Sequence, residues 1–149
     1  MNIQVGDKFP AFSGESQHGE KIDLADFHGK QKVVVYFYPK DRTPGCTREA
    51  IDFDRKYDEF QAAGAAVVGI SVDSLDSHKE FSVQCGLRFP LLSDNDRKLG
   101  EQLGILNEKG MTKRTTFVLS KDGTVEKIYE VDKVDGHAEE VLDFVRGMA

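Results

Sequence analysis

Two thiols are the side chains of this sequence best suited to covalent chemistry. Cys46 and Cys85 are the only cysteines among 149 residues, and 38 residues separate them. Two cysteines do not make a disulfide framework, so we expect free thiols that are either buried or catalytic. Cys46 is the better candidate nucleophile because it follows Thr43-Pro44, a pair typical of a helix start. The first turn of a helix favours the thiolate form of a cysteine.

A helix start is not sufficient to activate Cys46. A thiol with a pKa of about 8.5 is only about 3% thiolate at neutral pH, and lowering that pKa to about 6 requires about 3.4 kcal/mol. A helix N-terminus supplies about 0.3–1 kcal/mol and at most about 2 kcal/mol. A cation or further hydrogen-bond donors must therefore help. Thr43 offers a hydroxyl within reach, and Arg114, at the head of an expected core strand, is the candidate cation, although Arg42 and Arg48 are nearer in sequence.

Alternating strand and helix patterns position these residues. The apolar run 32–38 predicts a central strand buried on both faces, which Pro39 ends. A helix that begins at Pro44 and stops at Gly64 follows, then a second buried strand over 65–72 and a second helix up to Cys85. Strand–helix–strand connections make the two strands parallel. Cys46 then follows the carboxyl end of the first strand, where α/β proteins place their sites.

The remaining segments complete a mixed sheet. Residues 11–24 predict a short hairpin, and 94–103 a short third helix. Residues 114–120 and 125–131 predict an antiparallel pair joined by an Asp-Gly turn, before a C-terminal helix. We therefore expect an α/β protein of the thioredoxin-like class, with a mixed β-sheet flanked by helices on both faces, an N-terminal β-hairpin and one domain over residues 1–149.

Composition excludes several classes of function. Acidic residues outnumber basic ones 26 to 20, so the formal net charge is −6. A nonspecific nucleic-acid binder normally has a positive net charge. No apolar run approaches the roughly 18–20 residues of a membrane helix, and residues 1–8 lack the pattern of a secretory signal, so we expect a cytoplasmic protein. The four histidines are scattered, and neither a Walker A nor a dinucleotide fingerprint is present. We expect no metal and no organic cofactor.

The run 36–49, YFYPKDRTPGCTRE, resembles the peroxiredoxin active site, Pro-x-x-x-Thr-x-x-Cys. Its Thr-Pro-Gly-Cys-Thr form, followed by a glutamate, resembles the bacterioferritin comigratory protein, or peroxiredoxin Q, subfamily. The run 114–117, RTTF, is similar to the later arginine-containing strand of that family. The runs 71–74 and 89–94 also match its usual spacing, so the resemblance covers nearly the whole chain.

The resemblance implies a thiol peroxidase that reduces hydrogen peroxide and organic hydroperoxides. Cys46 would be the peroxidatic nucleophile, which attacks one peroxide oxygen and becomes a sulfenic acid. Thr43 and Arg114 would hold the peroxide oxygens and stabilise charge on the leaving oxygen. Thioredoxin or a glutaredoxin-like dithiol would supply the electrons. The resemblance favours a monomer, with a dimer as the alternative.

Three neighbours would support this chemistry. The resemblance implies that Pro39 keeps water from the sulfur, that a backbone N–H near Gly45 donates to the peroxide, and that Glu49 orients the arginine. Each residue also has a simpler interpretation. Thr43 fits a helix cap, Pro39 a strand stop, Glu49 a first-turn acid and Arg114 a surface charge at a strand end. Pro39, Thr43, Cys46, Glu49 and Arg114 all stand in the order and spacing of the family, and five such coincidences are harder to accept than one.

The sequence departs from the subfamily at Ile51, where many members carry a second cysteine within the same helix. Some relatives place the resolving cysteine on the next helix, where Cys85 lies. We therefore predict a Cys46–Cys85 disulfide that forms after partial unwinding of both helices. The alternative is a one-cysteine peroxidase with an external resolving thiol. In that case Cys85 is a core residue on the helix face of Leu75 and Phe81.

Other uses of a reactive thiol fit less well. A thiol–disulfide oxidoreductase would need a second cysteine at Glu49 to complete C-x-x-C. A cysteine phosphatase would need a phosphate-binding arginine at Asp52. A redox sensor or holdase that uses Cys46 to change its surface remains an alternative, and turnover of peroxide with excess dithiol separates it from the enzyme.

Overall fold

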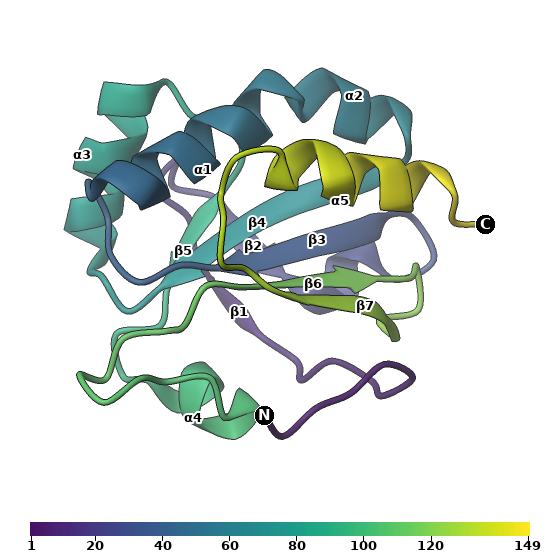
Figure 1. The fold of residues 1–149 in the computed structure, drawn as a ribbon, viewed down its shortest axis with the longest axis horizontal. Coiled ribbons are helices and arrows are strands. Elements are labelled where there is room, and N and C mark those ends of the chain that lie inside the picture. Colours follow the sequence, from purple (N-terminus) through teal and green to yellow (C-terminus); the bar gives the residue numbers. More distant parts are fainter.

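A five-stranded mixed sheet forms the centre of the structure, a computed structural model that describes residues 1–149 (Figure 1). Strands β3, β4 and β5 are parallel, whereas β6 is antiparallel to both β3 and β7. The expected parallel pair and the expected hairpin are both confirmed. In spatial order the strands are β5 (Leu91–Ser93), β4 (Ala65–Ser71), β3 (Lys32–Phe37), β6 (Thr115–Leu119) and β7 (Val125–Glu130).

Strand β3 lies in the middle of the sheet and is buried along its whole length. Successive side chains of a strand point to opposite faces, so the uninterrupted apolar run feeds two separate cores. Val34 and Tyr36 belong to one apolar cluster, and Val33, Val35 and Phe37 belong to the other. This burial on both faces explains why the run shows no alternation of polar and apolar residues.

The helices are shared unequally between the two faces (Figure 1). The Tyr36 face is covered by α1 (Pro44–Arg55), α2 (Tyr57–Ala62), α3 (Leu75–Cys85) and α5 (His137–Arg146). The other face carries the one-turn helix η1 (Leu24–Phe27), α4 (Lys98–Leu103) and the segment that contains Phe9. The expected N-terminal hairpin is formed by β1 (Ser13–Glu15) and β2 (Lys21–Asp23), which pair antiparallel.

The helix predicted from Pro44 to Gly64 is wrong in one respect, because it is broken at Lys56 into α1 and α2. Neither glycine nor proline lies at the break, so the local sequence does not signal it. The guanidinium of Arg88, far along the chain, donates to the main-chain carbonyl of Asp54 at 2.6 Å. A side chain that competes for a helix carbonyl in this way is a known cause of kinks.

Two short elements also differ from expectation around Asp94. The sequence analysis did not identify β5, which has only three residues and follows Pro90. The helix predicted from Asp94 begins only at Lys98, because the main chain of Asp94 continues the pairing with β4. The Asp94 carboxylate instead accepts from the N–H groups of Leu99 and Gly100, at 3.1 and 2.8 Å.

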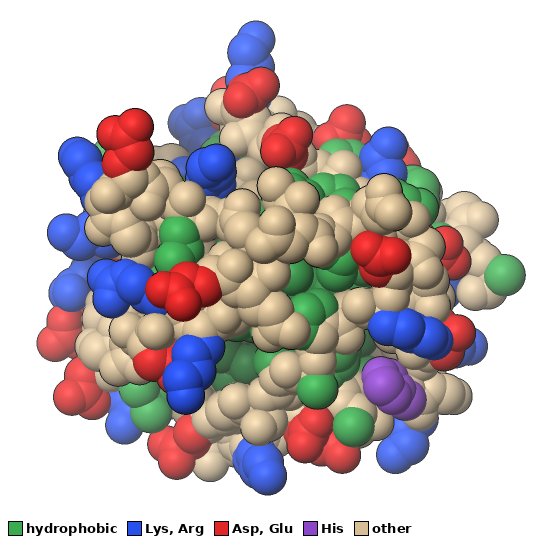
Figure 2. Space-filling view, turned by 90° about the horizontal axis from the view of Figure 1, so that it is seen from below, with side chains coloured by type: hydrophobic (Ala, Val, Ile, Leu, Met, Phe, Trp, Pro, Cys, Tyr) green, Lys and Arg blue, Asp and Glu red, His purple; other side chains and the backbone are tan.

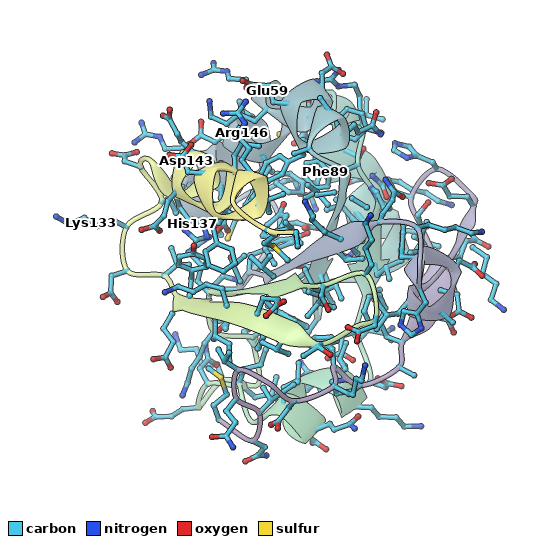
Figure 3. The ribbon with its side chains drawn as sticks, turned by 90° about the vertical axis from the view of Figure 1, so that its right-hand side faces the viewer. Glu59, Phe89, Lys133, His137, Asp143 and Arg146 are labelled. Atoms are coloured by element: carbon cyan, nitrogen blue, oxygen red, sulfur yellow. The ribbon has the colours of Figure 1, made fainter.

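Helix α5 is held to its neighbours at both ends, as Figure 3 shows. His137 begins the helix, and its Nε2 lies 2.8 Å from the hydroxyl of Thr116 on β6. Arg146, in the last turn, pairs with Glu59 of α2 at 3.1 Å. The first contact is buried and the second is exposed. No helix of the chain is both long and apolar enough to cross a membrane.

The face that carries α4 mixes charges of both signs around its rim, with apolar atoms in a central hollow (Figure 2). No basic stripe gathers on this face. Large apolar side chains are exposed at only three positions in the chain, namely Met1, Val5 and Val83.

Candidate active site

Cys46 lies in the first turn of α1 and is 1% exposed. The connection from β3 to this helix passes through Pro39, which is half-buried, and Thr43, which occupies the N-cap position. Thr43 does not cap the helix with its side chain. Its hydroxyl donates to the carbonyl of Lys40 at 2.8 Å, so the oxygen keeps its lone pairs free to accept a hydrogen bond.

Arg114 is the cation that the structure places at the thiol. Its Nη2 lies 3.3 Å from the Cys46 sulfur, and its Nη1 donates to Glu49 Oε1 at 2.6 Å. The residue precedes β6, which pairs with β3, so the sheet brings it across from a distant part of the sequence. Arg42 and Arg48, the nearer candidates, form exposed ion pairs with other residues.

Gly45 is required by the close approach of that guanidinium. A Cβ atom at this position would lie 3.3 Å from Arg114 Nη2, which is tighter than ordinary van der Waals contact. A side chain at this position would crowd the guanidinium, which would have to shift by a few tenths of an ångström. The sequence analysis gave Gly45 a backbone role only, so this steric role is a finding of the structure.

Glu49 is buried, and only one of its two carboxylate oxygens is paired. Oε2 has no hydrogen-bond partner, and the same is true of the buried hydroxyl of Tyr36. Burial raises the pKa of Glu49 to about 7, although the adjacent Arg114 lowers it. For the arginine, burial lowers the pKa, but the charges of Glu49 and Cys46 outweigh that effect and raise it. Arg114 therefore remains a cation throughout the neutral range.

Cys85 is the last residue of α3 and is half-buried against the cluster that contains Cys46. Both cysteines are free thiols, so the structure shows the reduced form. Burial, followed by the negative charge of Asp41, raises the pKa of Cys85. The structure thus brings Arg114 and Glu49 to Cys46 but does not join the two sulfurs.

Comparisons with known proteins agree with this geometry. Residues 5–128 match the model of the AhpC/TSA family. The chain belongs to the AhpC/TSA family. It is 37% identical to peroxiredoxin Bcp of Bacillus subtilis, over 100% of this chain and 99% of that protein. It is thus a peroxiredoxin of the Bcp or peroxiredoxin Q type, and a thiol-dependent peroxidase.

Solved structures resemble this peroxiredoxin over most of its length. Peroxidoxin BcpB from Mycobacterium tuberculosis is 32% identical, covers 99% of each chain and superimposes with a TM-score of 0.90. The bacterioferritin comigratory protein of Xanthomonas campestris is 37% identical over 91% of this chain and 90% of its own, with a TM-score of 0.84. These similarities confirm the thioredoxin-like fold.

The raised pKa of Glu49 makes the stability of this peroxiredoxin depend on pH. The group has a pKa of about 7 when folded, against an ordinary value of 4.5, so the folded state binds its proton more tightly. Protonation of Glu49 therefore contributes to the free energy of unfolding. The contribution is complete below about pH 4.5 and is lost as the pH rises through about 7. We expect the free energy of unfolding of the wild type, relative to Glu49→Gln, to fall between pH 5 and 8 in urea titrations.

A matched control for this measurement is Glu59→Gln, which removes an exposed carboxylate that pairs with Arg146 (Figure 3). We expect its difference from the wild type to stay nearly constant over the same range. A difference between wild type and Glu49→Gln that is equally flat would contradict the assignment.

The sequence analysis did not recognise a buried polar cluster beside the site. His78 was counted only among the four scattered histidines, and Asp41 was only part of the run 36–49. In the structure His78 Nδ1 lies 2.7 Å from Asp41 Oδ2, and both side chains are buried. A histidine and two serines among apolar neighbours on α3 were the available signal. No group of three or more histidine, cysteine or acidic side chains is arranged to hold a metal ion.

Proposed function

We propose that Cys46 is the peroxidatic thiol, that Cys85 resolves its sulfenic acid as an intramolecular disulfide, and that thioredoxin or a glutaredoxin-like dithiol reduces the disulfide. The observation that carries the proposal is the contact of Arg114 Nη2 with the buried sulfur, 3.3 Å away, in the first turn of α1. A guanidinium and a helix N-terminus together favour the thiolate, which is the nucleophile.

The first step oxidises Cys46 by two electrons. The thiolate attacks one oxygen of the hydroperoxide, a sulfur–oxygen bond forms and the oxygen–oxygen bond breaks. The second oxygen leaves with the electron pair of the broken bond and takes up a proton, as water or an alcohol. Negative charge therefore moves from the sulfur to the leaving oxygen. We propose that the cation Arg114, next to the sulfur, stabilises the thiolate before the reaction and the negative charge on the leaving oxygen during it.

The second step returns the sulfur to a reducible form. The Cys85 thiolate attacks the sulfenic sulfur of Cys46, and the hydroxyl group leaves as water after taking up the proton that the thiol released. The reductant then supplies two electrons and two protons in thiol–disulfide exchange. Cys46 lies in the first turn of α1 and Cys85 is the last residue of α3, and we propose that both helix ends unwind in part as the disulfide forms.

Three further residues receive roles in this proposal. The Thr43 hydroxyl, whose proton is already given to Lys40, accepts a hydrogen bond from the protonated peroxide oxygen. Pro39 lies between the end of β3 and α1 and shields the sulfur from bulk water. Gly45 leaves room for the Arg114 guanidinium and exposes a backbone N–H in the first turn of the helix.

The substrates we propose are hydrogen peroxide and small organic hydroperoxides. The similar Xanthomonas campestris protein is described by its alkyl peroxide reduction activity, which supports the organic class. We also propose that residues 1–149 act as one domain, because both apolar clusters share the single central sheet. A monomer is supported by the scarcity of exposed apolar side chains. A reducing compartment such as the cytoplasm suits a cycle that consumes dithiols.

Intact mass after one equivalent of hydrogen peroxide tests the assignment of Cys85. We expect the reduced wild type to lose about 2 Da as the disulfide closes, and Cys85→Ser to gain about 16 Da as a sulfenic acid. Under turnover with thioredoxin, Cys85→Ser should lose most of its steady-state rate while its first oxidation stays fast. A wild type that gains mass instead would favour the one-cysteine enzyme, and no change in mass within seconds would overturn the peroxidase itself.

A further inference from the structure

A buried ion pair joins the two segments that carry the cysteines. Asp41 lies five residues before Cys46, and His78 lies seven residues before Cys85. The two side chains are almost completely buried, and Asp41 Oδ2 is 2.7 Å from His78 Nδ1. Neither residue forms a hydrogen bond with a sulfur, although the charge of Asp41 contributes to the raised pKa of Cys85.

The hydrogen bonds around His78 assign a proton to its Nε2. Nε2 lies 2.9 Å from the carbonyl oxygen of Leu92, which can only accept, so this nitrogen carries a proton. The Asp41 carboxylate accepts from the hydroxyls of Tyr38 and Ser77, at 2.6 and 2.8 Å, and its Oδ2 lies within hydrogen-bond distance of His78 Nδ1. A buried pair that is fully hydrogen-bonded in this way is tolerated, whereas a broken one is costly.

The same cluster is tied to the central sheet. The N–H of Asp41 donates to Asp73 Oδ2 at 2.9 Å, and that oxygen also accepts from the hydroxyl of Ser71 at the end of β4. Leu92, the acceptor for His78, belongs to β5. The start of α3 and the loop before α1 are thus fastened to one another and to the carboxyl ends of two strands.

The last turn of α3 is more exposed to solvent. Val83 is 83% exposed, Gln84 is exposed, and Gly86 ends the helix in the left-handed conformation. Because helices fray at their ends, unwinding is easiest at this exposed terminus. The residues that unwind would include Cys85, and His78 would stay in place.

We propose that Asp41 and His78 form a pivot for the resolving step, holding the start of α3 against the loop before Cys46 while the end of α3 unwinds. They are positioning residues. They act through the chain segments 41–46 and 78–85, the two tethers, which connect the pair to the two sulfurs. The inference rests on the proposed role of Cys85 as the resolving thiol, since it concerns only the attack of that thiol on the sulfenic sulfur.

Chain lengths show what the pivot contributes. In the helix, seven residues place Cys85 about 10 Å from His78, whereas the same residues unwound can span about 23 Å. With the pair intact, tethers of five and seven residues connect the two cysteines to one fixed point. If the hydrogen bonds to Asp73 and Leu92 are lost together with the pair, the nearest fixed points are the strand ends at Phe37 and Ser71, and the tethers lengthen to nine and fourteen residues. Loop-closure statistics then lower the encounter probability about threefold.

Two variants and one control test the pivot. Asp41→Asn keeps the shape of the side chain but removes the charge that faces His78. Ser77→Ala is milder, because it deletes only one hydrogen bond to the Asp41 carboxylate. It tests the pivot if Asp41→Asn does not fold. Leu142→Ala removes a buried side chain of α5, which belongs to neither tether, and controls for loss of stability.

Three quantities are measured on each protein after mixing with hydrogen peroxide. They are the rate of Cys46 oxidation, the rate at which the species lighter by about 2 Da appears, and the peroxide concentration at which Cys46 gains about 32 Da as a sulfinic acid. In Asp41→Asn we expect oxidation of Cys46 within about twofold of the wild type. Disulfide formation should be slower by up to about threefold, and sulfinic acid should appear at correspondingly less peroxide. Ser77→Ala should shift the rate of disulfide formation and the peroxide concentration for sulfinic acid in the same directions. Leu142→Ala should shift neither of these two quantities.

The outcomes separate the two proposals. A wild type that forms no intramolecular disulfide overturns the role of Cys85, and the pivot with it. Equal rates of disulfide formation in the wild type and in the folded pivot variants overturn the pivot alone. The same shift in Leu142→Ala would also overturn it, because the effect would then follow stability rather than position.

Discussion

Replacement of Cys46 by serine is expected to lower peroxide turnover by at least about 10³-fold. The thiolate is the nucleophile, and a serine hydroxyl is almost entirely un-ionised at neutral pH, with no adjacent base to activate it. Arg114 would still lie in the site, but no group there could accept an oxygen atom. The measurement is consumption of hydrogen peroxide with excess dithiol, with the wild type and the variant at equal concentration.

The control for this experiment is Cys85→Ser, which keeps the peroxidatic sulfur. We expect it to consume one equivalent of peroxide rapidly, whereas Cys46→Ser should consume none. Both variants should unfold at urea concentrations near that of the wild type, because the sulfur and oxygen side chains are similar in size. Rapid consumption by Cys46→Ser would place the peroxidatic chemistry at Cys85 or elsewhere.

Replacement of Arg114 by glutamine is expected to slow the oxidation of Cys46 by about 10²-fold, which corresponds to about 2.7 kcal/mol. The variant loses the charge 3.3 Å from the sulfur, where negative charge is present in the thiolate and then moves to the leaving oxygen. It also leaves the buried carboxylate of Glu49 without its cation. The rate of the first oxidation, followed by rapid mixing at several pH values, reports the loss.

Arg114→Lys and Arg48→Gln are the informative companions. The lysine keeps a positive charge but cannot donate to the Cys46 sulfur and to Glu49 with the same planar group, so an intermediate rate is expected. Arg48 lies two residues after Cys46, yet it pairs with Asp135 on the surface. Its replacement should change the rate by less than about threefold. If Arg48→Gln were as slow as Arg114→Gln, general charge rather than the buried contact would control the thiol.

Most of the fold follows from patterns that are local in sequence. The apolar run at β3, the Ser74 and Gly86 caps of α3 and the Asp-Gly turn before β7 each specify their element within a few residues. The kink at Lys56 was not predictable in this way. It depends on Arg88, whose guanidinium reaches the carbonyl of Asp54 only after α3 has packed beside α1. Strand β5 was missed because three residues carry too short a pattern to identify.

The sequence by itself predicted Cys46 as the nucleophile and gave its location in the fold. Cys46 follows Pro44 by two residues at the end of a strand buried on both faces, and those features fix a thiol in the first turn of a helix. Resemblance over the run 36–49 added the identity of the chemistry. The same reasoning named Arg114 as the cation, but only as one of three arginines.

Only the tertiary structure decided which groups surround the thiol. Pairing of β6 with β3 brings Arg114 to the Cys46 sulfur, and packing of α3 against the loop before α1 brings His78 to Asp41. Spacing along the chain carries no information about such contacts between distant residues. Burial likewise decided the ionisation of Glu49, because the pKa of a carboxyl depends on the solvent and charges that reach it and not on its neighbours in sequence.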